Sequence, residues 1–293
     1  MAQIGFIGLG LMGSAMVQRL LDCGHDLVVL GNRDRTGVEA ALARGAQEVQ
    51  SARALAEAVD TVMLCMGTSE HVEGRMRGED GVMAGLRDGA VVVDFGTSLP
   101  ASTKALAAEV AALGGSYLDA PLGRTPAHAL DGALNIMCAG DPTGFEKVRP
   151  LLDDLGENVF HLGASGTGHT VKLLNNFFGM TVANAMAEAF GMADMAGVDR
   201  KDLYDVMSAG PLHSGMMDFV AAYGLEGDPN KLQFSIANAT KDVGYYRRMA
   251  QDLGTESLVS GGPFAGLSGA VEAGHGDKMV SQIVDYYADR LKG

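Results

Sequence analysis

A glycine motif near the N-terminus restricts the fold of this 293-residue chain more than any other feature. An apolar run at residues 3–8 predicts a buried parallel strand, and residues 14–23 predict a helix. Between them stands G-x-G-x-x-G, whose glycines permit a tight turn, admit a pyrophosphate to the backbone and let helix and strand approach. A glycine-rich turn without a ligand is the weaker alternative in this context. The residues expected around a pyrophosphate are Gly8, Gly10, Leu11, Met12 and Gly13.

The end of the second predicted strand, residues 26–30, bears on the choice of dinucleotide. NAD-binding folds place an acidic residue there for the ribose hydroxyls. Here Asn32 and Arg33 follow the strand, with Arg35 nearby, and these side chains suit a 2′-phosphate. Asp34 could instead cap the next helix or neutralise Arg35. NADP(H) is therefore favoured, and NAD(H) remains the alternative.

Strands and helices alternate up to about residue 163. The carboxyl ends of parallel strands meet at one edge of a doubly wound sheet, where ligands bind. We therefore expect Thr97, the Gly67-Thr68 turn and the preceding Met66 to line the cofactor groove. Further strands are predicted at residues 61–66, 90–95, 116–119 and 133–139, and helices at residues 36–44, 69–76, 80–87 and 101–113.

The second half of the chain is helical, with breaks at Gly and Pro residues. The sequence therefore predicts an α/β fold in two domains. Residues 1–163 form a Rossmann doubly wound sheet, and residues 164–293 form an all-α domain whose first, long helix starts at the joint. A cleft between domains is a favoured ligand site. Helices are predicted at residues 167–196, 200–208, 212–223, 230–252, 262–274 and 277–291.

Two groups of polar residues are candidates for a substrate site. Lys172 and Asn176 lie one turn apart on the long predicted helix, among apolar neighbours. A lysine in such surroundings is paired, reaches solvent or lines a cleft. Arg124 and Thr125 stand at the turn of a Pro- and Gly-rich loop and suit a small oxyanion, although a plain surface arginine is the alternative. His128 fits a loop hydrogen bond better than acid–base chemistry.

Composition excludes several kinds of partner. A net charge of −14 argues against nucleic acid and anionic membrane surfaces, and the apolar runs are too interrupted to span a bilayer. The three cysteines form no CxxC, and the N-terminus shows no signal peptide, so a cytoplasmic protein without a metal site is expected. The apolar, Met-rich helical half favours a homodimer or homotetramer.

Four blocks in order along the chain resemble the β-hydroxyacid dehydrogenase family, which includes 3-hydroxyisobutyrate dehydrogenase and tartronate semialdehyde reductase. They are residues 5–13, 119–132, 166–176 and 241–242. The resemblance implies that Lys172 is the catalytic lysine and that Asn176 orients the substrate. It also implies that Lys241 reaches the cofactor, with Phe234 near the nicotinamide and Asp242 in support. Asn32 and Arg33 look like the family's pair for NADP.

Three departures from the family pattern matter. Met66-Gly67 replaces the usual Leu-Pro, and Gly96-Thr97 replaces the usual Ser-Thr. In the substrate loop, Gly123-Arg124-Thr125 replaces Ser-Gly-Gly and is similar to the sulfolactaldehyde reductases, in which an arginine suits a three-oxygen sulfonate.

The reaction expected from the loop is NADPH-dependent reduction of 3-sulfolactaldehyde to 2,3-dihydroxypropane-1-sulfonate, with the anionic head against Gly123, Arg124 and Thr125. A carboxylated semialdehyde (succinic, methylmalonic or tartronate) is the alternative substrate. A non-catalytic NADP-binding scaffold or an imine reductase would usually lack the lysine, which is present here as Lys172.

Overall fold

The computed structural model describes residues 3–292. The chain divides into two compact units, one that ends at Lys172 and one that starts at Leu173. The sequence had placed the division at residue 163. Each unit is described by itself.

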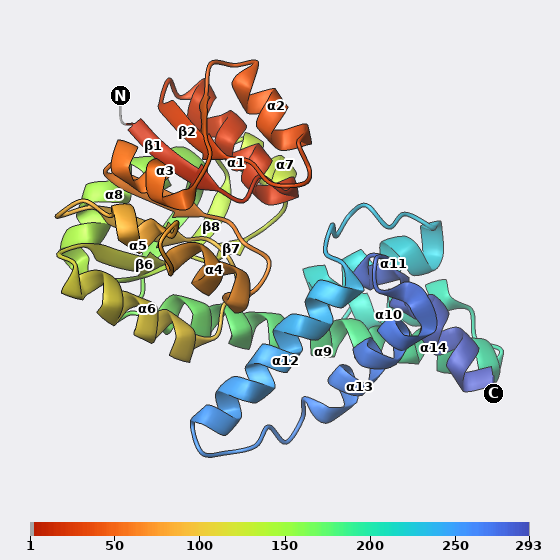
Figure 1. The fold of residues 1–293 in the computed structure, drawn as a ribbon. Helices are drawn as coiled ribbons and strands as arrows, with labels where there is room; N and C mark the ends of the chain where they lie inside the picture. The colour runs from red at the N-terminus through yellow and green to blue at the C-terminus, as the bar shows by residue number, and fades with distance from the viewer. Residues whose placement is uncertain (1–2, 293) are drawn as a thin grey trace. The chain divides into compact units, whose positions relative to one another are not determined.

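The first unit is built on a sheet whose first six strands are all parallel, in the order β3-β2-β1-β4-β5-β6 (Figure 1). This is the strand order of a Rossmann fold, and the order reverses between β1 and β4, where such folds bind dinucleotides. The predicted α/β class is confirmed. The strands are β1 (Gln3–Ile7), β2 (Asp26–Leu30), β3 (Gln47–Val49), β4 (Thr61–Leu64), β5 (Val91–Asp94), β6 (Ser116–Asp119), β7 (Leu122–Gly123), β8 (Leu134–Gly140) and β9 (Gly156–His161).

Both faces of this sheet are apolar. The central strands are nearly continuous runs of apolar residues, and successive side chains of each strand point to opposite sides. In β1, Ile4 and Phe6 belong to one buried cluster and Ile7 to the other. Gly5 also faces the second side, where a Cβ at this position would lie 2.2 Å from Leu55 Cδ2. A larger residue at position 5 would push α3 (Ala52–Ala58), the helix that carries Leu55, away from the sheet.

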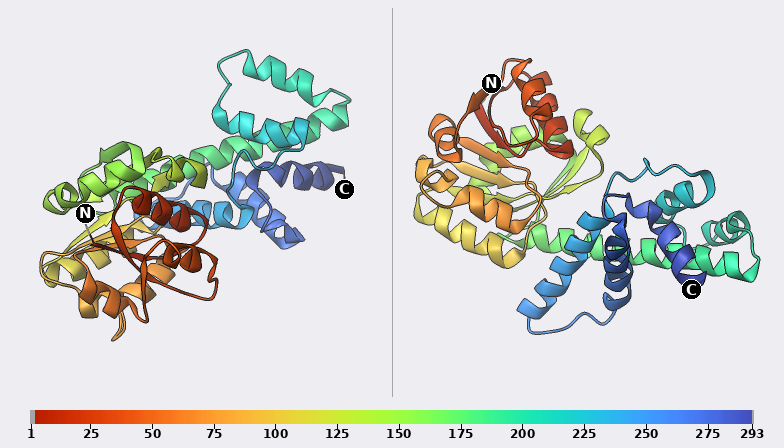
Figure 2. Two further views of the ribbon diagram at one scale, coloured as in Figure 1. Left: turned by 90° about the horizontal axis from the view of Figure 1, so that it is seen from above. Right: turned by 45° about the vertical axis from the view of Figure 1, so that its right-hand side comes forward.

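Helices cover both faces of the sheet (Figure 2). The sequence had left three of them unassigned, namely α3, α7 and α8. Asp141 caps α8 by accepting from the Gly144 N–H at 2.8 Å, and Pro142 starts the helix. The short α7 lies within the segment expected to be a shaped loop. The helices are α1 (Leu11–Asp22), α2 (Thr36–Leu42), α3 (Ala52–Ala58), α4 (Ser69–Met76), α5 (Val82–Gly85), α6 (Pro100–Ala112), α7 (Pro126–Leu130) and α8 (Pro142–Leu155).

The last strands extend the sheet with mixed pairing. β8 is antiparallel to β6 and β7 and parallel to β9. The chain therefore reverses between β7 and β8, and the segment that joins them carries the candidate substrate residues. β7 is two residues long, and its position is fixed by pairing with β8.

The second unit is all helical. The long helix α9 (Thr167–Ala196) begins in the first unit and continues through the second, with the bounds that the sequence predicts. Its apolar side chains, among them Met180 and Phe190, form one buried cluster with the helices that follow. The other segments are α10 (Arg200–Ser208), α11 (Gly215–Glu226), α12 (Ile236–Asp252), α13 (Gly261–Ala270), η1 (Val271–His275), η2 (Val280–Gln282) and α14 (Ile283–Lys292).

Within residues 3–292, no helix has the length and the apolar character needed to cross a bilayer.

Candidate active site

The glycine turn between β1 and α1 has the geometry that its motif requires. Gly8 has a φ of +99°, and a Cβ there would lie 2.3 Å from the carbonyl oxygen of Cys65. A Cβ at Gly13 would lie 1.9 Å from the Gly8 carbonyl oxygen. The helix can therefore approach the turn this closely only because residue 13 is glycine. Gly10 instead faces open space, with no atom within 4 Å of an added Cβ.

The start of α1 is suited to an anion. Its N-cap is Gly10, which offers no side-chain hydrogen bond, and its first turn holds no acidic residue. The first N–H groups of the helix are thus available, and the helix dipole favours negative charge at this end. The open space at Gly10 and this uncapped helix end fit the pyrophosphate of a dinucleotide.

A cavity of about 230 Å³ begins at this turn and runs along the carboxyl ends of β1, β2 and β4. Five of the predicted cofactor residues line it: Gly8, Gly10, Asn32, Met66 and Gly67. The sequence reasoning did not assign the other lining residues to the cofactor. They are Ile7, Leu9, Leu30, Gly31, Asp34, Val38, Cys65 and Arg75.

The remaining predicted cofactor residues do not line this cavity. Leu11 is 78% exposed, whereas Met12 packs against the apolar core. Gly13 is buried beneath the turn. Arg33 is exposed on the loop after β2, and Thr97 is half-buried after β5. Their predicted roles stay predictions.

Two charged side chains that follow β2, Arg35 and Asp34, have partners within the protein. The Arg35 guanidinium donates to both carboxylate oxygens of Glu48, at 2.6 and 2.9 Å. Arg35 is thus paired within the protein, and its expected contact with a 2′-phosphate stays a prediction. The Asp34 carboxylate accepts from the N–H of Thr36, the first residue of α2, at 2.9 Å, and this bond lowers the pKa of Asp34.

The start of α9 is fixed by a buried carboxylate. Asp119, at the end of β6, accepts from the Gly166 N–H at 2.8 Å and from the His169 N–H at 2.9 Å. The buried His169 ring adds a second attachment. Its Nε2 lies 3.2 Å from the Gly96 carbonyl oxygen, which can only accept, so we assign the proton to Nε2. Its Nδ1 lies 2.7 Å from Thr103 Oγ1.

Lys172 stands one turn after this anchored segment. Its ammonium donates to the carbonyl oxygen of Leu122 at 2.7 Å, and the residue is half-buried. Leu122 directly precedes Gly123, the first residue of the predicted substrate loop. The structure thus brings the predicted catalytic lysine to the predicted substrate loop, although 50 residues separate Lys172 from Leu122.

The loop side chains are bonded within the first unit. Arg124 has a φ of +78°, and its guanidinium donates to the Ala133 carbonyl oxygen at 2.7 Å and to the Glu157 carboxylate. Thr125 Oγ1 lies 2.8 Å from His128 Nδ1, so His128 makes a loop hydrogen bond. The partner of Arg124 is 33 residues away in sequence, and no local pattern predicted it.

The second unit holds the other predicted polar residues. Asn176 is 8% exposed, and its Nδ2 donates to Asp242 Oδ2 at 2.6 Å. Because a carboxylate only accepts, this bond fixes the amide orientation, and the Asn176 amide oxygen accepts from Asn175 Nδ2 at 3.3 Å. The Lys241 ammonium lies 3.0 Å from Asp242 Oδ1. Phe234 packs, partly buried, against the helical core.

Across the described chain, no cluster of three or more His, Cys, Asp and Glu side chains is arranged to hold a metal ion.

The strand order, the glycine turn and the cavity at the strand ends define a dinucleotide-binding protein of the Rossmann class. Family models match both parts of the chain. Residues 3–163 match the NAD binding domain of 6-phosphogluconate dehydrogenase, and residues 166–287 match the NAD-binding domain of NADP-dependent 3-hydroxyisobutyrate dehydrogenase. The chain belongs to the β-hydroxyacid dehydrogenase family and is an NAD(P)-dependent oxidoreductase.

Named relatives differ in their substrates. The chain is 36% identical to the 2-hydroxy-3-oxopropionate reductase of Escherichia coli over 197 residues, 67% of each protein. It is 31% identical to the 3-sulfolactaldehyde reductase of Escherichia coli over 288 residues, 97% of this chain and 95% of that one. The solved 3-hydroxyisobutyrate dehydrogenase of Mycobacterium tuberculosis, with L-serine, has a TM-score of 0.87 at 25% identity, over 98% of this chain and 99% of that one.

Proposed function

We propose that this protein reduces a small anionic semialdehyde to a primary alcohol with NADPH, and that 3-sulfolactaldehyde is its substrate. The observation that carries the proposal is the Lys172 ammonium at the start of the loop Gly123–Thr125. Similarity to a 3-sulfolactaldehyde reductase over 97% of the chain supports the substrate. The product is 2,3-dihydroxypropane-1-sulfonate.

The chain's own residues supply binding and proton transfer. When bound, the nicotinamide supplies the hydride. The Lys172 ammonium donates a hydrogen bond to the carbonyl oxygen of the aldehyde, stabilises the negative charge that develops there, and then protonates it. Asn176, one turn further along α9, accepts from a substrate hydroxyl with the second lone pair of its amide oxygen, because Asp242 holds the amide nitrogen and Asn175 donates to the same oxygen.

The backbone at Arg124 favours an anion-binding role for this residue. A non-glycine residue at positive φ costs about 1–2 kcal/mol, and such strain concentrates at functional sites. The Glu157 side chain that pairs with Arg124 is 59% exposed, so this pair contributes little to stability. A sulfonate can therefore replace Glu157 at small cost, and its three oxygens suit the guanidinium fork.

A carboxylated semialdehyde is the second candidate substrate, since a relative at 36% identity is named 2-hydroxy-3-oxopropionate reductase. Values of kcat/KM for 3-sulfolactaldehyde and for succinic, methylmalonic and tartronate semialdehydes separate the two. We expect the sulfonate to be preferred, and Arg124→Gly to lower its kcat/KM roughly 10- to 100-fold with little effect on an uncharged aldehyde.

Each other outcome rejects a part of the proposal. Higher kcat/KM for a carboxylate rejects the sulfonate substrate. Equal effects of Arg124→Gly on charged and uncharged aldehydes remove Arg124 from the anion site. Absence of turnover with all of them, in a protein that binds NADPH, indicates a non-catalytic scaffold.

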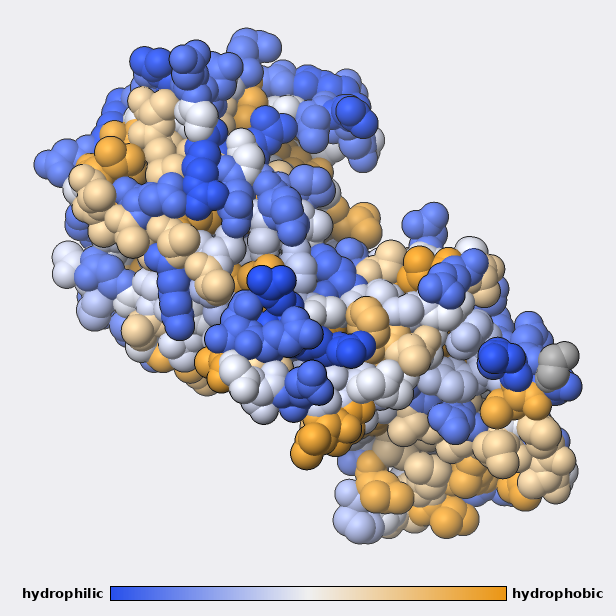
Figure 3. All heavy atoms as spheres, turned by 60° about the horizontal axis from the view of Figure 1, so that its bottom comes forward, coloured by the Kyte–Doolittle hydropathy of each residue, from blue (hydrophilic) through white to orange (hydrophobic). Residues whose placement is uncertain are grey.

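We also propose that the second unit associates with another copy of this chain. Hydrophobic residues gather on its surface (Figure 3, lower right). On α9, two pairs of large apolar side chains, 14 residues apart, lie on one face of the helix and are exposed, as in helices that pack against a partner. These residues, here called the α9 stripe, are Leu174, Phe178, Met192 and Met195, which are 47%, 69%, 51% and 57% exposed.

A further inference from the structure

We infer that Arg75 on α4 is the residue that recognises the 2′-phosphate of NADP(H) and sets the preference for this cofactor. The inference extends the proposed NADPH-dependent function and concerns the same cavity. Its subject is a residue that the sequence pattern did not assign to the site, because it lies in a helix and outside any motif.

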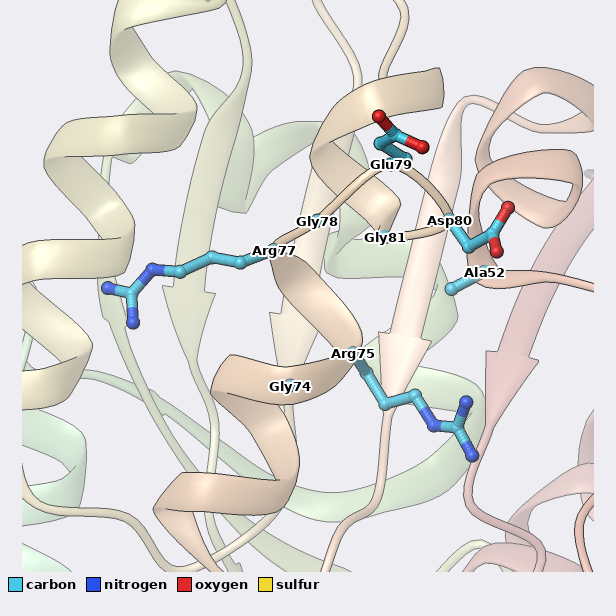
Figure 4. A pocket seen from close by; sticks show the side chains of 8 residues that line it. All are labelled: Ala52, Gly74, Arg75, Arg77, Gly78, Glu79, Asp80 and Gly81. Carbon is cyan, nitrogen blue, oxygen red and sulfur yellow. The ribbon is translucent and has the colours of Figure 1, made fainter.

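The position of Arg75 is the first argument. It lines the cavity that the glycine turn, the end of β2 and the end of β4 also line, and it is the only lysine or arginine among the described residues of that lining. Figure 4 shows a second, neighbouring pocket that Arg75 also lines, together with Glu79 and Asp80; in this view the Arg75 side chain leaves α4 on the opposite side from Arg77. Arg33, the arginine favoured from sequence, is not part of the cavity wall.

The pairing of nearby arginines is the second argument. Arg35 is held by Glu48, Arg53 by Glu57, and Arg77 by Glu73 and Glu109. In the part of the chain that the structure describes, no carboxylate forms an ion pair with Arg75. Arg75 is nevertheless half-buried at the edge of a nucleotide cavity. A half-buried cation in this place is suited to an anion supplied by the ligand.

The other lining residues agree with the adenosine end of the cofactor. Ile7, Leu30 and Val38 offer an apolar wall. Asp34 lines the cavity as well, and alone its carboxylate would favour ribose hydroxyls over a phosphate. One of its oxygens already accepts from the Thr36 N–H. The planar guanidinium of Arg75 can bind a phosphate in bidentate fashion and offset that charge.

Equilibrium binding tests this role without turnover. Isothermal titration of the full chain with 2′,5′-ADP and with 5′-AMP compares two ligands that differ by the 2′-phosphate alone. We expect Arg75→Ala to weaken 2′,5′-ADP by roughly 10- to 100-fold and to leave 5′-AMP nearly unchanged. Arg77→Ala is the matched control, because it removes the same charge two residues away, and it should change neither. Arg75→Gln repeats the test with a side chain of similar length.

The outcomes separate this inference from the proposed function. The role of Arg75 is overturned if the Arg75 variants bind both ligands more weakly by the same factor, or if they bind both as tightly as the wild-type protein. The same holds if Arg77→Ala weakens 2′,5′-ADP as much as Arg75→Ala. A wild-type protein that binds neither ligand and neither dinucleotide refutes the proposed function itself.

Discussion

At the scale of single residues, burial determines whether a cysteine thiol can ionise and react. Cys65 lines the cavity and is partly exposed, yet desolvation, with a smaller contribution from Asp94, raises the pKa of its thiol to about 12. Burial raises the pKa of Cys138 to about 12 as well. Both thiols are thus neutral at ordinary pH, and neither suits a nucleophilic role.

The raised pKa values of Cys65 and Cys138 predict that both thiols react slowly with alkylating reagents in the folded protein. Raising a thiol pKa from 9.0 to about 12 lowers the thiolate fraction at pH 8 by about 10³, and the thiolate is the species that reacts. Iodoacetamide labelling at pH 8, resolved by peptide mass spectrometry, should be slower by about this factor than in the urea-unfolded chain. Labelling of Cys65 at the unfolded rate would contradict the assigned environment.

Residue placements that depend on local spacing could be predicted from the sequence, whereas the roles proposed for these residues stay predictions. The glycine turn and the pair Lys172 and Asn176 are examples, because a turn or a helix period fixes their positions. Roles that depend on distant partners could not. The residues next to Arg35 in the sequence do not show that its guanidinium pairs with Glu48 on β3. Likewise, only the structure shows that α4 places Arg75 in the wall of the cavity.

At the scale of elements, the position of α9, the helix that carries Lys172, depends on its N-terminal attachment. Asp119 accepts two backbone N–H groups at the start of α9, and Lys172 follows within a turn. A shift of this helix end would move the ammonium away from the substrate loop.

Asp119→Ala should therefore lower both stability and turnover. We expect a loss of about 1–3 kcal/mol in the free energy of unfolding, since two buried N–H groups lose their acceptor. We also expect kcat to fall roughly 10- to 100-fold. Urea unfolding and steady-state kinetics measure the two effects. Asp141→Ala is the control, because Asp141 caps α8 in a similar way and should reduce stability while kcat is unchanged. Similar kcat in both variants would count against the positioning role.

Helices and strands could be predicted where the local sequence pattern is sufficient to define them. The bounds of α9 and α10 match the prediction because long helical periods end at Gly197 and at Gly210-Pro211. The short strands β3, β7 and β9 were not predicted. Their two to six residues carry no clear alternation, and pairing with β2 and β8 makes them strands.

At the scale of the whole molecule, the α9 stripe predicts self-association. Replacing Phe178 and Met195 together with Asp should shift the protein toward the monomer, because two charges would be buried in the interface. Light scattering after size-exclusion chromatography reports the mass of each variant. Leu258→Asp is the control, since Leu258 is 99% exposed but lies outside the stripe. A monomeric wild-type protein, or one whose mass the double variant does not change, would exclude the stripe as an interface.

The central claim is that the Lys172 ammonium acts on the reacting oxygen, and one kinetic comparison tests it. Lys147 serves as a matched control, since its ammonium also donates to a backbone carbonyl, that of Gly89, at 3.0 Å. With NADPH and 3-sulfolactaldehyde saturating, the single-turnover rate of NADPH oxidation should fall by about 10²–10⁴ in Lys172→Ala and stay unchanged in Lys147→Ala. A near-normal rate in Lys172→Ala, with NADPH binding intact, would contradict the account.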